Sequence, residues 1–345
     1  MQKAWTEKEL ETLRDTNLSI NDVAKKLNRT FISVERKRCR ERVVTKPPPP
    51  PPAPQAPDKL EHQVKLPRPE FGFLPLSAID SGDWIRLGLC GDTHLCCREE
   101  RLGELHTQYD LYQSEGITKV FHAGNPVDGY VPRINGGSVF ETSIDGQAQY
   151  FVDNYPRRKG ITTYFITGDD HEGWWMKEGF NFGAYLQFIA ENAGRTDLKY
   201  IGHVEADVEI RPKGSRVPTI MKIQHPGGGS AYARSYTGQK QVEAFEGGEK
   251  PGLLVQGHYH VSNYMNDRNI HVVSLPGFQD QTIFARKKRL RMEIGAAFVE
   301  FKVNPDDGAI SRFKVEFSRY FTRKYYQAYL KSDRTILKGH LIIKP

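Results

Sequence analysis

The stretch FITGDDHEGWW, residues 165 to 175, places four charged or imidazole side chains directly after a short apolar run. The run is rich in aromatic and β-branched residues, which is typical of a buried strand. A glycine ends it, so Asp169, Asp170, His171 and Glu172 lie at the carboxyl end of the strand. In an open α/β sheet, ligands bind outside this end of the strands. The stretch therefore predicts a functional site on an α/β fold.

Strand-like runs alternate with helical segments on both sides of this stretch. For example, Leu102, Leu105 and Tyr109 recur at steps of three and four, which predicts a helix between two strands. Such alternation indicates an α/β domain, and the runs after residue 250 predict a more antiparallel arrangement. The predicted strands span residues 84–90, 119–123, 162–167, 219–224, 252–256, 270–275, 296–303 and 313–318.

The composition limits the class of protein. The chain has 345 residues, of which 38% are hydrophobic and 26% are charged, enough for one large domain and a smaller unit. No stretch reaches the roughly 20 apolar residues of a membrane span, and the N-terminus lacks a secretory signal, so we expect no membrane partner. The four cysteines form no C-x-x-C pair. This usage predicts a cytoplasmic protein without disulfides.

The N-terminal segment carries most of the basic excess. Residues 1–46 hold 12 Lys and Arg against 7 Asp and Glu, which is five of the chain's seven net positive charges. Helix-start signals at Thr6, Ser19 and Thr30 predict three short helices, the last of them basic. The pattern resembles Myb-like helix-turn-helix domains of phages and bacteria, which implies a DNA-binding module over residues 1–45. The alternative is a small bundle whose arginines are only solvated. The candidate DNA-contacting residues are Arg36, Lys37, Arg38, Arg40 and Arg42.

A proline-rich linker, residues 46–67, separates this segment from the rest of the chain. Its six consecutive prolines, Pro47 to Pro52, favour an extended polyproline helix that acts as a spacer. The alternative role is a ligand for a proline-binding domain. A small DNA-binding module on such a tether also resembles phage-encoded arrangements, which would place the protein in the host cytoplasm.

Side chains that bind metals follow five of the predicted strands. Such residues suit a pair of divalent cations, because imidazole binds Fe, Zn and Mn while carboxylates balance the charge. We expect the five strand ends to converge on one crevice. The residues are Asp92 and His94, Asn125 and Asp128, Asp170 and His171, His225, and His258 and His260.

The order of these residues carries a resemblance. The blocks D-x-H, G-[D/N]-x-x-D, [N/D]-H-E, H and G-H-x-H, spread over residues 84 to 302, resemble the calcineurin-like metallophosphoesterase superfamily. The resemblance implies a metallophosphoesterase-type αββα sandwich, which we place over residues 68–318. A basic and aromatic extension follows over residues 319–345.

The resemblance also implies a cofactor and a role for each matched residue. The cofactor would be two divalent ions, Mn²⁺ first, with Fe and Zn as alternatives. His171 would donate a proton or stabilise an oxyanion, and Asp128 would orient its ring. Asn125 stands at the position that bridges the metals. One metal would be held by Asp92, His94 and His260, and the other by Asp170, His225 and His258.

Two positions depart from the family pattern. The family bridges its metals with aspartate where this chain has Asn125, and it has asparagine where this chain has Asp170. The exchange conserves the formal charge. Our hypothesis is a swapped site in which Asp170 supplies the carboxylate, and in one version also the bridge, while Asn125 binds through its amide oxygen. The alternatives are an enzyme with one metal and an inactive relative that only binds.

These observations predict a metal-dependent phosphoesterase that acts as a phosphodiesterase or nuclease on DNA. The basic runs at 286–291 and 319–331 would extend a surface that contacts phosphates, or they are only solvated. We expect Trp174 and Trp175 to pack in the interior rather than to stack on bases. The alternative functions are a phosphomonoesterase acting on protein or nucleotide, and a non-catalytic DNA-binding protein with a vestigial site.

Overall fold

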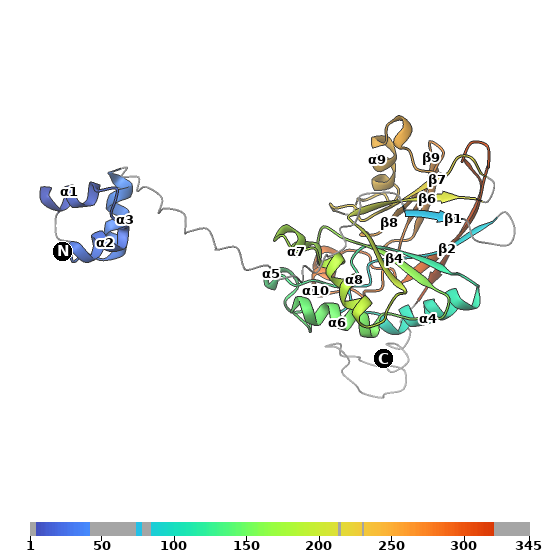
Figure 1. The fold of residues 1–345 in the computed structure, drawn as a ribbon, viewed down its shortest axis with the longest axis horizontal. Helices are drawn as coiled ribbons and strands as arrows, with labels where there is room; N and C mark the ends of the chain where they lie inside the picture. Colours follow the sequence, from blue (N-terminus) through green and yellow to red (C-terminus); the bar gives the residue numbers. More distant parts are fainter. Residues whose placement is uncertain (1–4, 42–73, 78–83, 213–214, 230, 321–345) are drawn as a thin grey trace, which may run out of the picture. The chain divides into compact units, whose positions relative to one another are not determined.

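The computed structural model describes residues 5–41, 74–77, 84–212, 215–229 and 231–320 (Figure 1). The chain divides into two compact units, Met1–Val64 and Lys65–Pro345. The predicted linker lies outside the described residues, as does the C-terminal extension from residue 321. Among the described residues, no helix is long and apolar enough to cross a membrane.

The N-terminal unit contains three helices that begin where the sequence predicts. They are α1 (Glu7–Arg14), α2 (Ile20–Lys26) and α3 (Phe31–Arg40). The hydroxyl groups of Thr6, Ser19 and Thr30 accept the backbone N–H three residues ahead, and Glu9 completes a capping box with Thr6. The helices enclose a small core formed by Leu13, Val23, Ala24 and Val34.

Arg38 corrects the predicted set of DNA-contacting residues. Its side chain is 3% exposed, because it follows the buried Val34 by one helical turn and shares its face of α3. The guanidinium donates to the carbonyls of Leu13, Asp15 and Leu18 at 2.7 to 2.9 Å. Arg38 therefore holds α3 to the turn that follows α1 and is not available to DNA.

The other four candidates have different surroundings. Arg36 and Arg40 are exposed on the opposite face of α3. Lys37 is half-buried and pairs with Glu41 at 2.9 Å. Arg42 lies outside the described residues. The exposed basic surface of α3 is therefore narrower than the sequence suggests.

The substitution Arg38→Met is expected to destabilise the N-terminal unit by about 2 to 4 kcal/mol, because buried carbonyls then lose their donor. Hydrogen exchange of the amides in α1 to α3 measures the change in the full chain. The exposed Arg36 on the same helix provides the control variant Arg36→Ala, which should leave the exchange unaltered. Equal protection in Arg38→Met and the wild type would contradict a structural role for this guanidinium.

The larger unit is a sandwich of two six-stranded sheets (Figure 1). The first sheet has the order β12 (Ile310–Arg319), β11 (Gly295–Val303), β2 (Ile85–Cys90), β3 (Lys119–Ala123), β4 (Thr162–Thr167) and β5 (Leu198–His203). In this sheet β2, β3, β4 and β5 pair in parallel, β11 pairs antiparallel with β2, and β12 pairs antiparallel with β11. The second has the order β1 (Leu74–Ser77), β6 (Glu205–Arg211), β7 (Thr219–Gln224), β8 (Leu253–Gln256), β10 (Ile270–Ser274) and β9 (Asn263–Asp267).

The arrangement after residue 250 differs from the prediction in one pair. β9 and β10, like β11 and β12, are antiparallel as expected, but β8 and β10 pair in parallel. After β8 the chain runs through a loop, residues 257–262, and through β9, and then returns beside β8 as β10. The strands β1, β5, β6 and β9 were not predicted.

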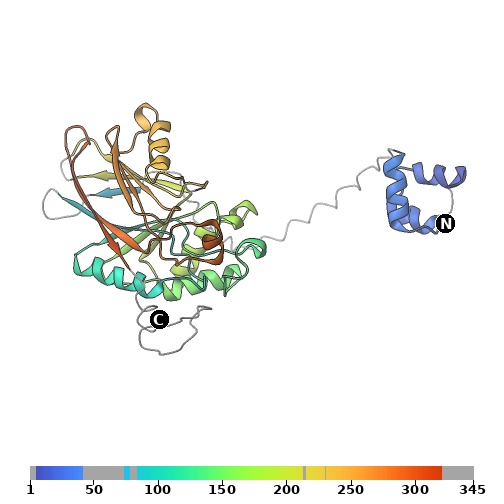
Figure 2. The ribbon, with the colours of Figure 1, turned by 180° about the vertical axis from the view of Figure 1, so that it is seen from behind.

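The two sheets pack face to face, and helices cover both outer faces. Alternate residues such as Leu89 of β2 and Met221 of β7 meet in the apolar layer between the sheets. The outer face of the first sheet is covered by α4 (Leu102–Ser114), α6 (Ile144–Asn154) and α8 (Phe182–Asn192), and that of the second by α9 (Tyr236–Ala244), which lies on the opposite side of the sandwich (Figure 2). The predicted αββα fold is confirmed. The remaining short helices are α5 (Pro132–Asn135), α7 (Gly173–Lys177), η1 (Gly247–Glu249) and α10 (Ile283–Lys288).

Candidate metal centre and active site

The loops that follow five strands bring the predicted site residues together. Three of these strands, β2, β3 and β4, are neighbours in the first sheet, and β7 and β8 are neighbours in the second. The carboxyl ends of parallel strands meet at one edge, which is why residues far apart in sequence converge here. The loop after β2 carries Asp92 and His94, the loop after β3 Asn125 and Asp128, the loop after β4 Asp170 and His171, the loop after β7 His225, and the loop after β8 His258 and His260.

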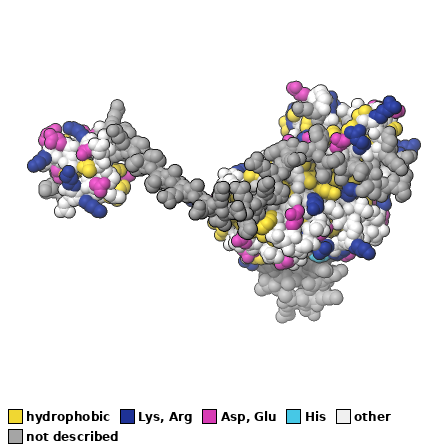
Figure 3. Space-filling view, viewed as in Figure 1, with side chains coloured by type: hydrophobic (Ala, Val, Ile, Leu, Met, Phe, Trp, Pro, Cys, Tyr) yellow, Lys and Arg dark blue, Asp and Glu magenta, His cyan; other side chains and the backbone are white. Residues whose placement is uncertain are grey.

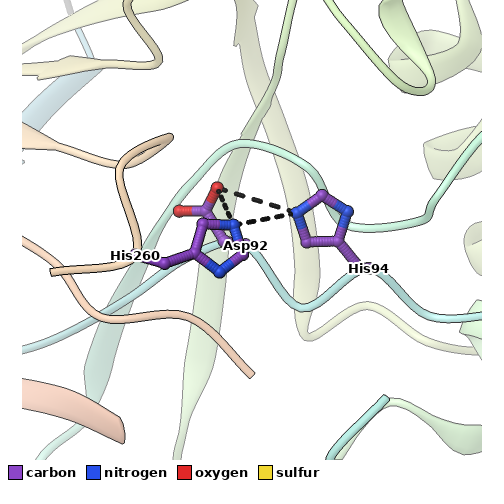
Figure 4. Close-up of side chains that lie close together, drawn as sticks. All are labelled: Asp92, His94 and His260. Carbon is purple, nitrogen blue, oxygen red and sulfur yellow. Dashed lines mark hydrogen bonds and ion pairs between the residues drawn. The ribbon is translucent and has the colours of Figure 1, made fainter. Parts of the chain in front are cut away.

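Asp92, His94 and His260 form the first group of donors, and their side chains point toward one another (Figure 4). The Nε2 atoms of the two histidines lie 3.2 Å apart, and Oδ1 of Asp92 lies 3.3 Å from Nε2 of His260. All three residues are buried. The Asp92 carboxylate also accepts the backbone N–H of His258, which ties the loop after β2 to the loop after β8.

Asp170, His225 and His258 form the second group. The Asp170 carboxylate lies 3.3 Å from Nε2 of His225 and 3.4 Å from Nδ1 of His258. The Nδ1 of His225 donates to the Ala123 carbonyl at 2.8 Å, which leaves Nε2, on the side of Asp170, as the nitrogen that can bind a metal. Asn125 adjoins this group and donates from Nδ2 to Asp170 at 3.1 Å.

Both groups fit a divalent cation. Each offers one carboxylate and two imidazoles, whose donor atoms all lie within 4.8 Å of one another. The Asn125 Oδ1 and the His225 Nε2 are buried without a hydrogen-bond partner, and such atoms point to a missing positive partner. Gly168 leaves the space open, because a Cβ there would clash with the Asn125 Oδ1.

The carboxylates of both groups carry charge, although Asp92 is buried and Asp170 is partly buried. Burial acts to raise the pKa of Asp92, but the adjacent His260 and His225 hold it well below its usual value. Burial likewise opposes ionisation of Asp170, and the imidazoles of His225 and His258 lower its pKa further than burial raises it. The site therefore presents ionised carboxylates to an incoming cation.

His171 lies next to the first group and is fixed by Asp128. The Asp128 Oδ1 lies 3.0 Å from Nδ1 of His171 and 2.8 Å from Nδ1 of His94. Burial acts against a charged His171 ring, but the Asp128 carboxylate, helped by Asp170 and Glu172, raises its pKa to about 10. The ring, 24% exposed, is therefore protonated at neutral pH.

Asp128 does more than the predicted orientation of His171. By its contact with Nδ1 of His94 it also turns the Nε2 of that ring toward the first group, an arrangement common among metal-binding histidines. Two amides, Asn135 and Gln279, donate to the Asp128 carboxylate at 3.0 and 3.1 Å. Neither was predicted, because Asn135 lies at the end of the short helix α5 and Gln279 in a loop, and neither belongs to a motif of fixed spacing.

Six of the nine predicted site residues adopt a positive φ. These six are half of the twelve non-glycine residues that have a positive φ in the part of the chain that the structure describes. L-residues rarely adopt this conformation, and the cost is tolerated where the surrounding structure dictates the backbone, often at functional sites. The six are Asp92, His94, Asn125, His171, His258 and His260, with φ between 44° and 77°.

Of the residues that follow His171, some support the loop of the site and one lines the cavity in front of it. Glu172 is fully buried, and its Oε1 accepts the Gly168 N–H at 2.7 Å, which closes the loop beneath the site. Trp175 packs against Phe182 in the interior, as expected. Trp174 is half-buried and packs on the His171 ring instead, with centroids 5.2 Å apart.

The comparisons with known proteins find similarity only among solved structures. No protein-family model matches the chain, and no curated protein does. An archaeal phosphodiesterase is 13% identical over 68% of this chain and 100% of its own, with a TM-score of 0.35. YfcE, a phosphoesterase from E. coli, is 13% identical over 67% of this chain and 98% of its own, with a TM-score of 0.35. Vps29 with zinc from Entamoeba histolytica is 9% identical over 68% of this chain and 99% of its own, with a TM-score of 0.31.

Two of these neighbours are named as a phosphodiesterase and a phosphoesterase. Their names and similarity carry no argument about the activity of this chain. Its function is inferred from its own residues.

Proposed function

We propose that this chain is a metal-dependent phosphoesterase with a dinuclear site that cleaves phosphodiester bonds of DNA. The observation that carries the proposal is the pair of donor groups, one buried and one partly buried, each with one carboxylate and two imidazoles, the second of which contacts Asn125. Asp92, His94 and His260 would hold one ion, and Asp170, His225 and His258 the other. A bound pair of divalent ions would activate water and balance the charge of the phosphoryl oxygens.

His171 would supply the proton for the leaving oxygen. Its Nδ1 is engaged by Asp128, so Nε2 is the atom left for a substrate. The raised pKa keeps a proton on the ring at neutral pH, and a protonated imidazole is a general acid. His171 also lines the cavity in front of the donor groups, where a phosphate would be bound.

The N-terminal unit supports DNA as the substrate. Its second and third helices are joined by a four-residue turn with Asn28 in the left-handed conformation, and Arg36 and Arg40 are exposed on α3. Lys and Arg side chains lie among acidic ones on the face of this unit seen in Figure 3. A DNA-binding unit tethered to the catalytic unit would raise the local concentration of phosphodiester.

The test compares substrates in Mn²⁺, using the full chain and a variant that lacks residues 1–57. The full chain is expected to cleave end-labelled DNA and to hydrolyse the small diester methyl p-nitrophenyl phosphate, and both activities should disappear with chelator. The shortened chain should hydrolyse the small diester at the full rate but cleave DNA less well, with a weaker salt dependence. Hydrolysis of a phosphate monoester alone would indicate a phosphomonoesterase. DNA binding without any turnover would indicate a non-catalytic protein.

A further inference from the structure

The cavity in front of the donor groups extends well beyond them. Its volume is about 500 Å³, more than a phosphate group needs. Asn125, Asp170 and His171 line one part of it. The remaining lining includes Trp174 of α7 and residues of α5, and much of it comes from the segment Thr282–Met292, which contains α10.

We propose that this second part of the cavity is a nucleotide subsite, in which a base stacks on Trp174 and the neighbouring phosphate binds Lys288 and Arg291. The proposal rests on the proposed function, since it names how the same site recognises its substrate. It assigns specificity to residues outside the motifs that resemble the phosphoesterase family.

Trp174 has the position expected of a base-stacking residue. Its ring lies against the His171 ring at an interplanar angle of 25°, and it lines the cavity. A base would therefore stack on the face of Trp174 that is turned away from His171, and the indole would lie between the base and the proton donor. Trp175, the next residue, is 7% exposed and packs in the core. Of the two adjacent indoles, only that of Trp174 lines the cavity. Stacking on an aromatic ring is the usual sequence-tolerant contact to single-stranded nucleic acid.

The α10 segment brings positive charge to the same cavity. α10 ends at Lys288, and the φ of 57° at the next residue, Arg289, turns the chain so that Leu290, Arg291 and Met292 continue along the cavity. Lys288 and Arg291 line the cavity, whereas Lys287 does not. The ionised carboxylates lie at the metal groups, so these cations suit an anion bound farther out, such as the next phosphate of a strand.

Apolar side chains complete the subsite. Ile134 and Phe284 both line the cavity, and they are 52% and 51% exposed. Large apolar side chains that are exposed beside a polar site favour a ligand with apolar faces. A nucleotide combines a flat base, a sugar and a repeated phosphate, which matches the aromatic, apolar and cationic parts of this lining.

The first test isolates the base. Methylphosphonate and the 5′-methylenephosphonate analogue of thymidine monophosphate, neither of which can be hydrolysed, are compared as inhibitors of methyl p-nitrophenyl phosphate hydrolysis. The thymidine analogue is expected to inhibit the wild type more strongly, and Trp174→Ala should reduce this preference on the order of tenfold. Trp174→Phe should restore most of it. Because the readout is a ratio of two inhibition constants, a general effect of Trp174 on His171 cancels.

The outcomes separate this proposal from the proposed function. A preference that survives in Trp174→Ala, or no preference in the wild type, would overturn the stacking subsite while the phosphoesterase stands. If the wild type does not hydrolyse the small diester at all, the proposed function fails, and the subsite fails with it.

The second test isolates the cations with two adjacent lysines. Lys288→Ala should raise KM for single-stranded oligothymidine and reduce the slope of log affinity against log salt by about 0.7. Lys287→Ala removes the same charge from the same helix outside the cavity, and it should leave both quantities unchanged. Equal effects of the two variants would assign the charge to the general field of the surface and overturn the phosphate contact.

Discussion

Replacing His171 with alanine is expected to lower kcat for DNA cleavage by about 10²- to 10⁴-fold, the usual contribution of a positioned general acid. His171 forms a third cluster with His94 and Asp128, but Asp128 engages its Nδ1 and the two groups assigned to the ions do not include it, so the metal content should not change. The two quantities are measured on one preparation, as cleavage of end-labelled DNA in Mn²⁺ and as metal per chain by mass spectrometry. Near wild-type cleavage by the variant would remove His171 from the mechanism.

The leaving group gives a sharper form of this test. A p-nitrophenolate ion leaves readily without a proton, so His171→Ala should impair methyl p-nitrophenyl phosphate hydrolysis much less than DNA cleavage. The contribution of a general acid is present below its pKa and is lost as the pH rises through it, and burial opposed by Asp128 sets that pKa at about 10 in this chain. His106→Ala, in the distant helix α4, is the control and should alter neither reaction. Equal losses for both substrates would mean that the ring stabilises charge rather than donates a proton.

Much of the fold and the grouping of the site could be predicted because each motif follows a strand. Apolar runs such as those before Asp92 and Asp170 identify central strands, whose carboxyl ends meet by geometry. The unpredicted strands lie at or near the edges of the sheets. β6, for example, alternates charged and apolar residues, and both β5 and β6 are only partly buried, so they lack the continuous buried apolar run of a central strand.

The features that were missed depend on tertiary contacts. Arg38 looks like part of a basic cluster, and only the packing of α3 reveals that its guanidinium replaces water at three carbonyls. The one available signal was its spacing of four residues from Val34. Trp174 and Trp175 are identical in type, and the short helix α7 decides which of them faces the interior. The six positive-φ residues of the site are all Asp, Asn or His, the types enriched in this conformation, but these types also occur widely at negative φ and so do not predict it.

The exchange between Asn125 and Asp170 can be tested by reversing it. Asp170→Asn would leave an amide at both positions and no carboxylate in the second group, so we expect affinity for the second ion to fall on the order of 100-fold or more. The double variant Asn125→Asp with Asp170→Asn restores one carboxylate and one amide in reversed order, and it should recover two ions per chain. Titration calorimetry and metal counting under saturating Mn²⁺ measure both.

The reason for expecting recovery is the direct contact between the two side chains. Asn125 Nδ2 donates to Asp170 Oδ1 at 3.1 Å, so exchanging the amide and the carboxylate keeps one of each in this contact. Asn125→Asp alone places two carboxylates in that contact; their repulsion raises the pKa of one of them, and binding of the second ion should become more dependent on pH. A double variant that stays at one ion would show that the positions are not interchangeable. A wild type that never exceeds one ion per chain would contradict the dinuclear site itself, because Asn125 would then join no second metal to the first.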